Sequence, residues 1–184
     1  MNLKVLFILH EGFEEIEAVV PWDILHRAHV DVLTASLSDN TQVMGVHQIQ
    51  VTANCLFSSL QSYDDFHGII IPGGHGIFNV LDRTDLHQCL QQFNRDSKWI
   101  AAICAAPLLL KRAGILPENF TAHISIKNDL PRLRAEPVVV DHHFITANGP
   151  GAAFEFAFEM VGALLSKDLA LSIKKFMSCE ESVP

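Results

Sequence analysis

A cysteine stands where an apolar run gives way to a helical pattern in the middle of the chain. Residues 99–103 are typical of a buried strand, and Cys104 follows them directly. Pro107 suits the first turn of a helix, and Gly114 suits the position just beyond its end. A thiol at such a junction lies near unpaired backbone N–H groups, whose partial positive charge favours the nucleophilic thiolate. The alternative is an inert buried cysteine, because cysteine is among the residues most often found in protein cores.

The elements around this cysteine alternate between strands and helices. Short apolar runs predict buried strands, and apolar residues three or four positions apart predict helices. The predicted strands are residues 4–10, 30–36, 68–71, 99–103, 137–140 and 144–147, with an antiparallel excursion in 43–52. The predicted helices are residues 14–28, 84–94, 107–113, a segment opened by 149–151 that runs to 165, and 167–177. This order predicts an α/β domain spanning residues 1–184, with a parallel sheet covered on both faces.

In such folds ligands bind at the carboxyl ends of the strands. Residues 11–17, the loop 72–76 and Cys104 each follow a predicted strand, so we expect them to line one crevice, bordered by 149–151. The loop lacks the third glycine of a dinucleotide-binding motif, and the chain has no G-K-[ST] sequence, which argues against nucleotide binding. Its glycines either present backbone N–H donors to a reacting atom or form a plain turn.

Composition narrows the class of protein. The chain has 184 residues, 49% of them apolar, and a formal net charge of −8, which argues against a nucleic-acid-binding protein. The apolar run 5–9 is far too short to span a membrane, so we expect a cytoplasmic protein without a membrane partner. No C-x-x-C pair is present, so we expect neither a zinc motif nor a disulfide framework. The cysteines, all expected to be free thiols, are Cys55, Cys89, Cys104 and Cys179.

Several motifs together resemble the ThiJ/PfpI superfamily over almost the whole chain. They are Glu14-Glu15-Ile16-Glu17, Ile71-Pro72-Gly73-Gly74, Ala101-Ala102-Ile103-Cys104-Ala105-Ala106-Pro107 and Gly149-Pro150-Gly151. Asp23, Arg27 and the segment 154–156 resemble the branch that contains protein deglycases. The resemblance implies a flavodoxin-like three-layer sandwich with a mostly parallel, doubly wound sheet. It also implies a homodimer and a nucleophile-elbow cysteine that works without a cofactor.

The resemblance assigns roles to individual residues. Cys104 matches the nucleophile, and Glu17 matches a protonated glutamate that hydrogen-bonds the sulfur, for which a raised pKa is expected beside a thiolate. His123 matches a histidine that approaches the cysteine and moves protons. The backbone N–H donors around the reacting group are expected from Gly73, Gly74 and Ala105.

Simpler interpretations of the same residues remain open. Glu17 also suits the start of a helix, where a negative charge is favoured. His123 is one of 10 histidines, most of which are expected at the surface. A metal site is not expected, because Cys104, His123 and Glu17 are dispersed in the sequence and His142-His143 lacks an H-E-x-x-H pattern.

Three positions depart from the family pattern. Ala106 replaces a glycine found in many relatives, which adjusts the elbow, and Asn148 stands where a relative carries arginine, which alters anion or substrate contacts. Ala105 stands where the protease-like members have a histidine, which argues against peptidase activity.

Two functions use the same residues. In the first, the Cys104 thiolate attacks a small reactive dicarbonyl such as methylglyoxal, or a glycation adduct, and Glu17 and His123 move protons. In the second, Cys104 is oxidised to a sulfinate held by Glu17, and the protein acts as an oxidative-stress sensor or chaperone. A third possibility is a site that persists without robust turnover. Cys55 aligns with a cysteine near the dimer interface and is a candidate second oxidation site.

Overall fold

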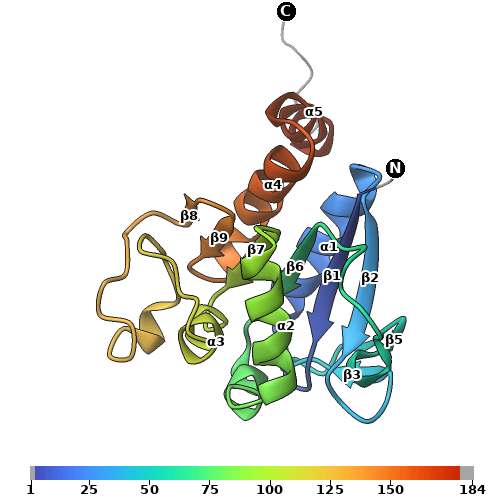
Figure 1. Cartoon of the computed structure of the whole chain (residues 1–184). Coiled ribbons are helices and arrows are strands. Elements are labelled where there is room, and N and C mark those ends of the chain that lie inside the picture. Colours follow the sequence, from blue (N-terminus) through green and yellow to red (C-terminus); the bar gives the residue numbers. More distant parts are fainter. Residues whose placement is uncertain (1–2, 179–184) are drawn as a thin grey trace, which may run out of the picture.

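A computed structural model describes residues 3–178 and shows a sheet of seven strands between two layers of helices (Figure 1). The strands stand in the order β5-β2-β1-β6-β7-β9-β8, and neighbours are parallel except for the antiparallel pair β8 and β9. They are β1 (Lys4–Leu9), β2 (Asp31–Ser36), β5 (Cys55–Leu56), β6 (Gly68–Ile71), β7 (Trp99–Ile103), β8 (Val138–Asp141) and β9 (Phe144–Ala147). The predicted flavodoxin-like sandwich with a mostly parallel, doubly wound sheet is confirmed.

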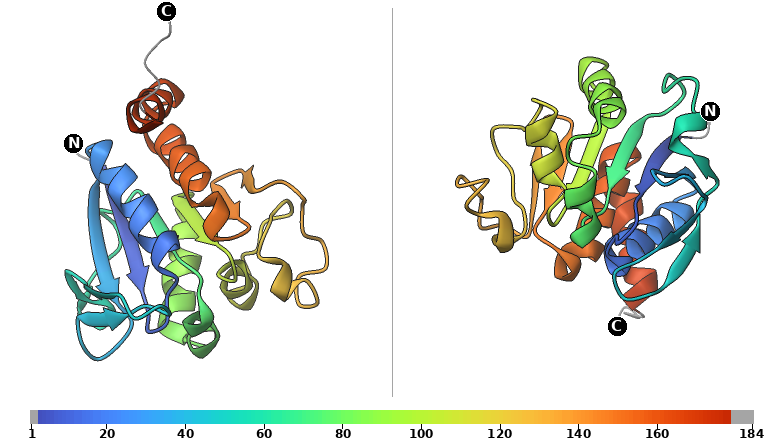
Figure 2. Two further views of the ribbon diagram at one scale, coloured as in Figure 1. Left: turned by 180° about the vertical axis from the view of Figure 1, so that it is seen from behind. Right: turned by 90° about the horizontal axis from the view of Figure 1, so that it is seen from below.

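Helices cover both faces of this sheet, as the views in Figure 2 show. They are α1 (Glu15–Arg27), α2 (Thr84–Arg95), α3 (Pro107–Arg112), α4 (Ala153–Leu164) and α5 (Lys167–Ser178). Helices α1 and α4 pack together on one face and α2 and α3 on the other, while α5 packs on α4. Short 3-10 turns are η1 (Phe57–Ser59), η2 (His75–Asn79), η3 (Ile124–Ile126) and η4 (Pro150–Ala152). Within residues 3–178, no helix has both the length and the apolar character needed to cross a bilayer.

Strand β1 shows why the central strands are apolar at every position. Its side chains alternate between the two faces, with Leu6 and Ile8 in the core under α2 and α3, and Val5, Phe7 and Leu9 in the core under α1 and α4. All five are fully buried. Successive side chains of the strand point to opposite faces of the sheet. Because helices cover both faces, every position is apolar.

The predicted excursion after β2 is a hairpin that forms its own two-stranded antiparallel sheet. Its strands are β3 (Gln42–Met44) and β4 (Gln50–Thr52). Pro21 lies inside α1, which runs without interruption from Glu15 to Arg27. The first strand ends at Leu9 rather than at His10, because the chain turns there toward α1.

The site-bearing loops converge because their strands are neighbours in the sheet. Strands β1, β6 and β7 lie side by side and point the same way. Their carboxyl ends lead into residues 10–14, 72–76 and 104–106, respectively. The expected meeting of these segments is confirmed by the contacts described next.

Candidate functional site

Cys104 occupies a strained turn between β7 and α3. Its φ of +63° lies in the left-handed region, which is costly for a residue with a side chain. Two backbone hydrogen bonds hold it there: its N–H donates to Ala147 O at 2.8 Å, and its carbonyl accepts from His123 N–H at 2.8 Å. The thiol is half-buried. This is the predicted nucleophile-elbow geometry, with the strained turn held by the end of β9 and by the residue before η3.

Glu17 is fully buried in the first turn of α1. The Glu14 side chain caps the helix by accepting from Glu17 N–H at 2.9 Å. The Glu17 carboxyl accepts from Gly73 N–H through Oε2 at 2.8 Å, whereas its Oε1 has no hydrogen-bond partner within residues 3–178. A Cβ added at Gly73 would lie 2.7 Å from Cys104 Cβ and 2.8 Å from Glu17 Oε2. The thiol and the carboxyl therefore meet over Gly73, which has to be a glycine.

The electrostatics of this pair differ from those expected for a simple helix-terminus thiolate. Burial raises the pKa of Glu17 to about 7, against the opposing effects of Gly73 N–H and the Cys104 thiol. Burial, followed by the charge of Glu17, raises the pKa of Cys104 to about 12. The expectation of an intrinsically acidic thiol is thus wrong. Cys104 precedes the six-residue helix α3 by three positions and lies beside a buried carboxyl. The expected rise in the pKa of Glu17 is confirmed, but burial of the carboxyl causes it rather than a neighbouring thiolate.

Two acids this close titrate as one unit. The pair loses its first proton near pH 7, and the second loss is pushed to about pH 12. Between these values the pair holds one proton, which has two possible positions. In one form Glu17 is ionised beside a neutral thiol, and in the other Glu17 holds the proton beside a Cys104 thiolate. The second form carries both a nucleophile and an adjacent acid.

The three predicted backbone donors divide into two groups. The N–H groups of Gly74 and Ala105 hydrogen-bond the Cys104 sulfur and lower its pKa, as a stabilised thiolate requires. Gly73 does not act on the sulfur, because its N–H is engaged by the Glu17 carboxyl. Gly74 adopts a φ of +95°, and a Cβ there would lie 2.4 Å from Gly12 O. Its backbone freedom allows the N–H to face the cysteine.

His123 is joined to the site through its backbone. Its N–H donates to Cys104 O, and its ring Nδ1 accepts from Ser125 N–H at 3.2 Å. The proton of the neutral ring therefore lies on Nε2. The ring lines a cavity of about 550 Å³ together with Asn148 and Gly149. Gly149 and Gly151 line this cavity, and a Cβ at Gly149 would lie 3.3 Å from His123 Cδ2. Cys104, Glu17 and the loop 72–76 are not among its lining residues, so the border that residues 149–151 were expected to form around the cysteine stays a prediction.

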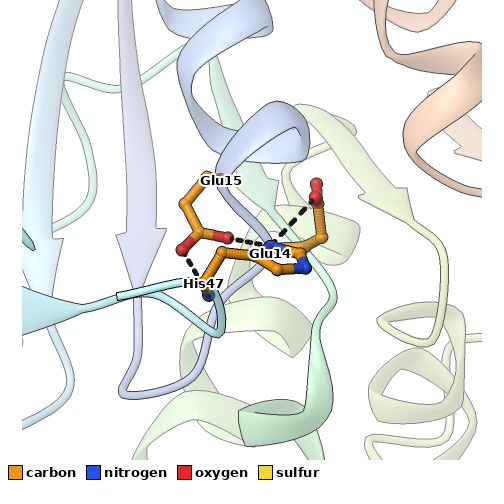
Figure 3. A group of neighbouring side chains, drawn as sticks. All are labelled: Glu14, Glu15 and His47. Atoms are coloured by element: carbon orange, nitrogen blue, oxygen red, sulfur yellow. Dashed lines mark hydrogen bonds and ion pairs between the residues drawn. The ribbon is translucent and has the colours of Figure 1, made fainter. Parts of the chain in front are cut away.

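A second acidic cluster, which no local sequence pattern indicates, anchors the start of α1. Figure 3 shows Glu14, Glu15 and His47 turned toward one another. The Glu15 carboxylate accepts from His47 N–H at 2.6 Å, from His47 Nδ1 at 2.9 Å and from Ile49 N–H at 3.4 Å. Burial opposes its charge, but these hydrogen bonds outweigh burial and lower the pKa of Glu15. With both carboxylate oxygens of Glu15 already engaged, the cluster ties α1 to the hairpin and so positions Glu17.

Because Glu17 is ionisable and buried, it should make the free energy of unfolding depend on pH. The pKa of the Glu17 carboxyl is near 7 in the folded protein, against its ordinary value of 4.5. Its contribution to stability is therefore fully present below pH 4.5 and is lost as the pH rises through 7. Gln keeps the oxygen that accepts from Gly73 N–H but carries no charge. We expect Glu17→Gln to be more stable than the natural protein by roughly 2–3 kcal/mol at pH 8, with little difference at pH 4.5. Urea unfolding at both pH values measures this, and an equal difference at the two values would contradict it.

A strained cysteine at the end of a central strand, with a buried carboxyl and two N–H groups around its sulfur, defines a flavodoxin-like α/β protein with a cysteine at a nucleophile elbow. The model of the DJ-1/PfpI family matches residues 3–163, and the chain belongs to this family. The relatives and solved structures that resemble it support this assignment.

Two curated relatives carry the name of an activity. The glutathione-independent glyoxalase DJ-1 of Schizosaccharomyces pombe is 30% identical, over 96% of this chain and 98% of its own. The glutathione-independent glyoxalase DJR-1.2 of Caenorhabditis elegans is 31% identical, over 90% of each chain. The solved structure of oxidised Toxoplasma gondii DJ-1 is similar with a TM-score of 0.90 at 31% identity, covering 96% of this chain and 98% of that one.

Proposed function

We propose that this protein converts small reactive dicarbonyls such as methylglyoxal into hydroxy acids without glutathione or another cofactor, with glycation adducts as related substrates. The observation that carries the proposal is the meeting of the Cys104 thiol with the buried Glu17 carboxyl over Gly73. The similarity to two glutathione-independent glyoxalases supports it.

The proposed reaction begins when the Cys104 thiolate attacks the aldehyde carbon. A C–S bond forms, the carbonyl π electrons move to oxygen, and Glu17 gives that oxygen its proton, which yields a hemithioacetal. A base then removes the hydrogen of the former aldehyde carbon, and a proton is returned to the neighbouring carbon. The hydroxyl on the former aldehyde carbon loses its proton and becomes the thioester carbonyl, while the neighbouring carbonyl oxygen gains a proton and becomes the hydroxyl. Glu17 and His123 are the groups that move these protons. The resulting thioester adds water, and its C–S bond breaks to release the hydroxy acid and the thiol. The sum is dicarbonyl plus water to hydroxy acid, with no external oxidant or reductant.

The proposal is tested by supplying methylglyoxal to the purified protein in buffer without glutathione and measuring lactate. Lactate should accumulate to many moles per mole of protein. Cys55→Ser serves as the control, because Cys55 lies in β5 at the edge of the sheet and its loss should leave turnover unchanged. Lactate no higher than in protein-free buffer would contradict the proposal.

Oxidation sensing is the second candidate, and a specific observation favours it. Glu17 Oε1 is buried and has no hydrogen-bond partner among the described residues, so a protonated Glu17 has a donor to offer an oxidised sulfur. With two equivalents of hydrogen peroxide, the thiol becomes a sulfinic acid and two waters are released. Peptide mass spectrometry after mild peroxide should show two added oxygens at Cys104 before Cys89, with Cys55 as the second site. Uniform oxidation of these thiols would count against it. Cys179 lies outside the described residues.

A homodimer completes the proposal, and its support is an apolar surface on α1 and the hairpin. Ile16 and Val19 of α1 are 48% and 46% exposed, and Ile49 is 54% exposed beside them, where its N–H reaches Glu15. A second copy of the chain is the proposed occupant. Val19→Glu should convert the dimer to a monomer in sedimentation equilibrium, whereas Val140→Glu, at an equally exposed position on β8, should not. A monomeric natural protein would exclude the dimer.

The proposal also places the protein in the cytoplasm. Reducing conditions there keep a reactive thiol such as Cys104 in the reduced form that nucleophilic attack requires. Fractionation of cells that express a tagged copy tests the location, and recovery outside the cytoplasmic fraction would contradict it.

A further inference from the structure

A buried histidine lies next to the site without belonging to it. His10 follows β1 and is only 1% exposed. Its ring lies between two backbone carbonyls, with Nδ1 at 3.2 Å from Glu11 O and Nε2 at 3.2 Å from Pro72 O. It also packs against Gly76, where an added Cβ would lie 2.8 Å from Nδ1. None of the steps proposed above uses this imidazole.

The Pro72 carbonyl links His10 to the reactive pair. The carbonyl of Pro72 and the N–H of Gly73 belong to one peptide group. Nε2 of His10 faces the oxygen end of this group at 3.2 Å, and the N–H end donates to Glu17 Oε2 at 2.8 Å. Hydrogen bonds in such a chain polarise one another, so a donor on the carbonyl makes the N–H a stronger donor. We propose that His10 is a positioning residue that acts on the Glu17 carboxyl through the Pro72–Gly73 peptide group.

The proposal requires a particular tautomer. Two carbonyl oxygens face the ring, so a neutral imidazole can donate to only one of them. The contact with Pro72 O is fully buried, whereas the contact with Glu11 O is only part-buried. An unpaired buried acceptor costs more than one that solvent can reach, and this difference favours the proton on Nε2.

The surroundings favour the neutral ring at physiological pH. Burial lowers the pKa of His10, against the opposing effects of the two carbonyls and of the Glu11 charge. Glu11 is the charged group that acts on the ring, and its own carboxylate turns toward Met44 N–H and Ser38 Oγ. The groups that face the ring from the β6 end and from η2 are the backbone of Pro72 and Gly76, which do not titrate.

The test uses the pH dependence of Cys104 alkylation by iodoacetamide, followed by peptide mass spectrometry. His10→Leu removes the donor to Pro72 O, which weakens Gly73 N–H as a donor and disfavours the Glu17 carboxylate. The midpoint of the alkylation profile should move up by about half a pH unit. His10→Gln places an amide donor near the position of Nε2 and should restore the natural midpoint. His75→Leu is the matched control, because it replaces an exposed histidine in the loop 72–76. This variant should leave the midpoint unchanged.

Equal midpoints for His10→Leu and the natural protein would overturn the proposal. If His10→Leu does not fold, two NMR measurements on the natural protein decide the matter. Ring ¹⁵N shifts should show the proton on Nε2, and the Gly73 amide resonance should follow the titration of His10 as well as that of Glu17. A ring protonated on Nδ1, or a Gly73 amide insensitive to His10, would exclude the relay. These experiments measure alkylation or NMR signals and not turnover. A negative result for His10 can therefore be told apart from a failure of the protein to convert dicarbonyls.

Discussion

Replacing Cys104 with serine should reduce kcat/KM for methylglyoxal by at least about 1,000-fold, because the step that captures the carbonyl requires a thiolate. A serine hydroxyl fits the same turn, but it is far less acidic than a thiol, and the Glu17 carboxylate is too weak a base to make it a strong nucleophile. The elbow should survive, since the hydrogen bonds to Ala147 O and from His123 N–H are made by the backbone of residue 104. Steady-state lactate formation measures the loss.

The matched control makes the same chemical change at Cys55, which should retain full turnover. Circular dichroism and thermal unfolding of both variants separate a chemical effect from a folding effect. Turnover by Cys104→Ser within a few-fold of the natural protein would show that the thiol is not the nucleophile.

Replacing Glu17 with glutamine should reduce kcat by about 100- to 10,000-fold, the usual contribution of a positioned acid or base. The amide keeps the acceptor for Gly73 N–H, so the loop should stay in place, but it can neither take the thiol proton nor return it to the substrate oxygen. The variant should be inactive while being more stable above neutral pH, as argued from its burial. A stable protein with a poor active site is the expected signature of a buried catalytic acid.

Glu155→Gln is the control for this variant, since Glu155 also occupies the first turn of a helix, α4, but is exposed. It should leave both turnover and stability nearly unchanged. A Glu17→Gln protein that keeps natural kcat would mean that proton transfer is carried by another group, and His123 would be the next residue to replace.

Much of this arrangement follows from local sequence patterns. Buried parallel strands have long apolar runs, so β1, β6 and β7 and the polar residues after them can be placed without coordinates. Because the carboxyl ends of neighbouring strands meet, Cys104 and the Gly73-Gly74 turn can be assigned to one crevice. The choice of Glu17 over Glu14 and Glu15 came from the family resemblance, since all three suit a helix start.

Long-range contacts account for what the sequence did not reveal. His47 lies 32 residues from Glu15, and His10 lies 62 residues from Pro72, so no local pattern joins either pair. The sequence predicts an acidic Cys104 because it shows the start of a helix, but it does not show the burial beside Glu17 that raises the pKa of the thiol. The loop motif predicts a Gly73 N–H near the sulfur, but it does not show which neighbour accepts from each donor, and in the structure the Glu17 carboxyl accepts from Gly73 N–H.

The most direct test of a proton-sharing Cys104–Glu17 pair is the alkylation rate of Cys104 as a function of pH in the natural protein and in Glu17→Gln. In the natural protein the rate should rise with a midpoint near pH 7 and then level off, because the thiolate form appears when the pair loses its first proton. In Glu17→Gln the midpoint near pH 7 should vanish, and the rate should keep rising toward alkaline pH. Identical profiles for the two proteins, or a midpoint near the value of about 8.5 for an ordinary cysteine in the natural protein, would show that the thiol titrates alone.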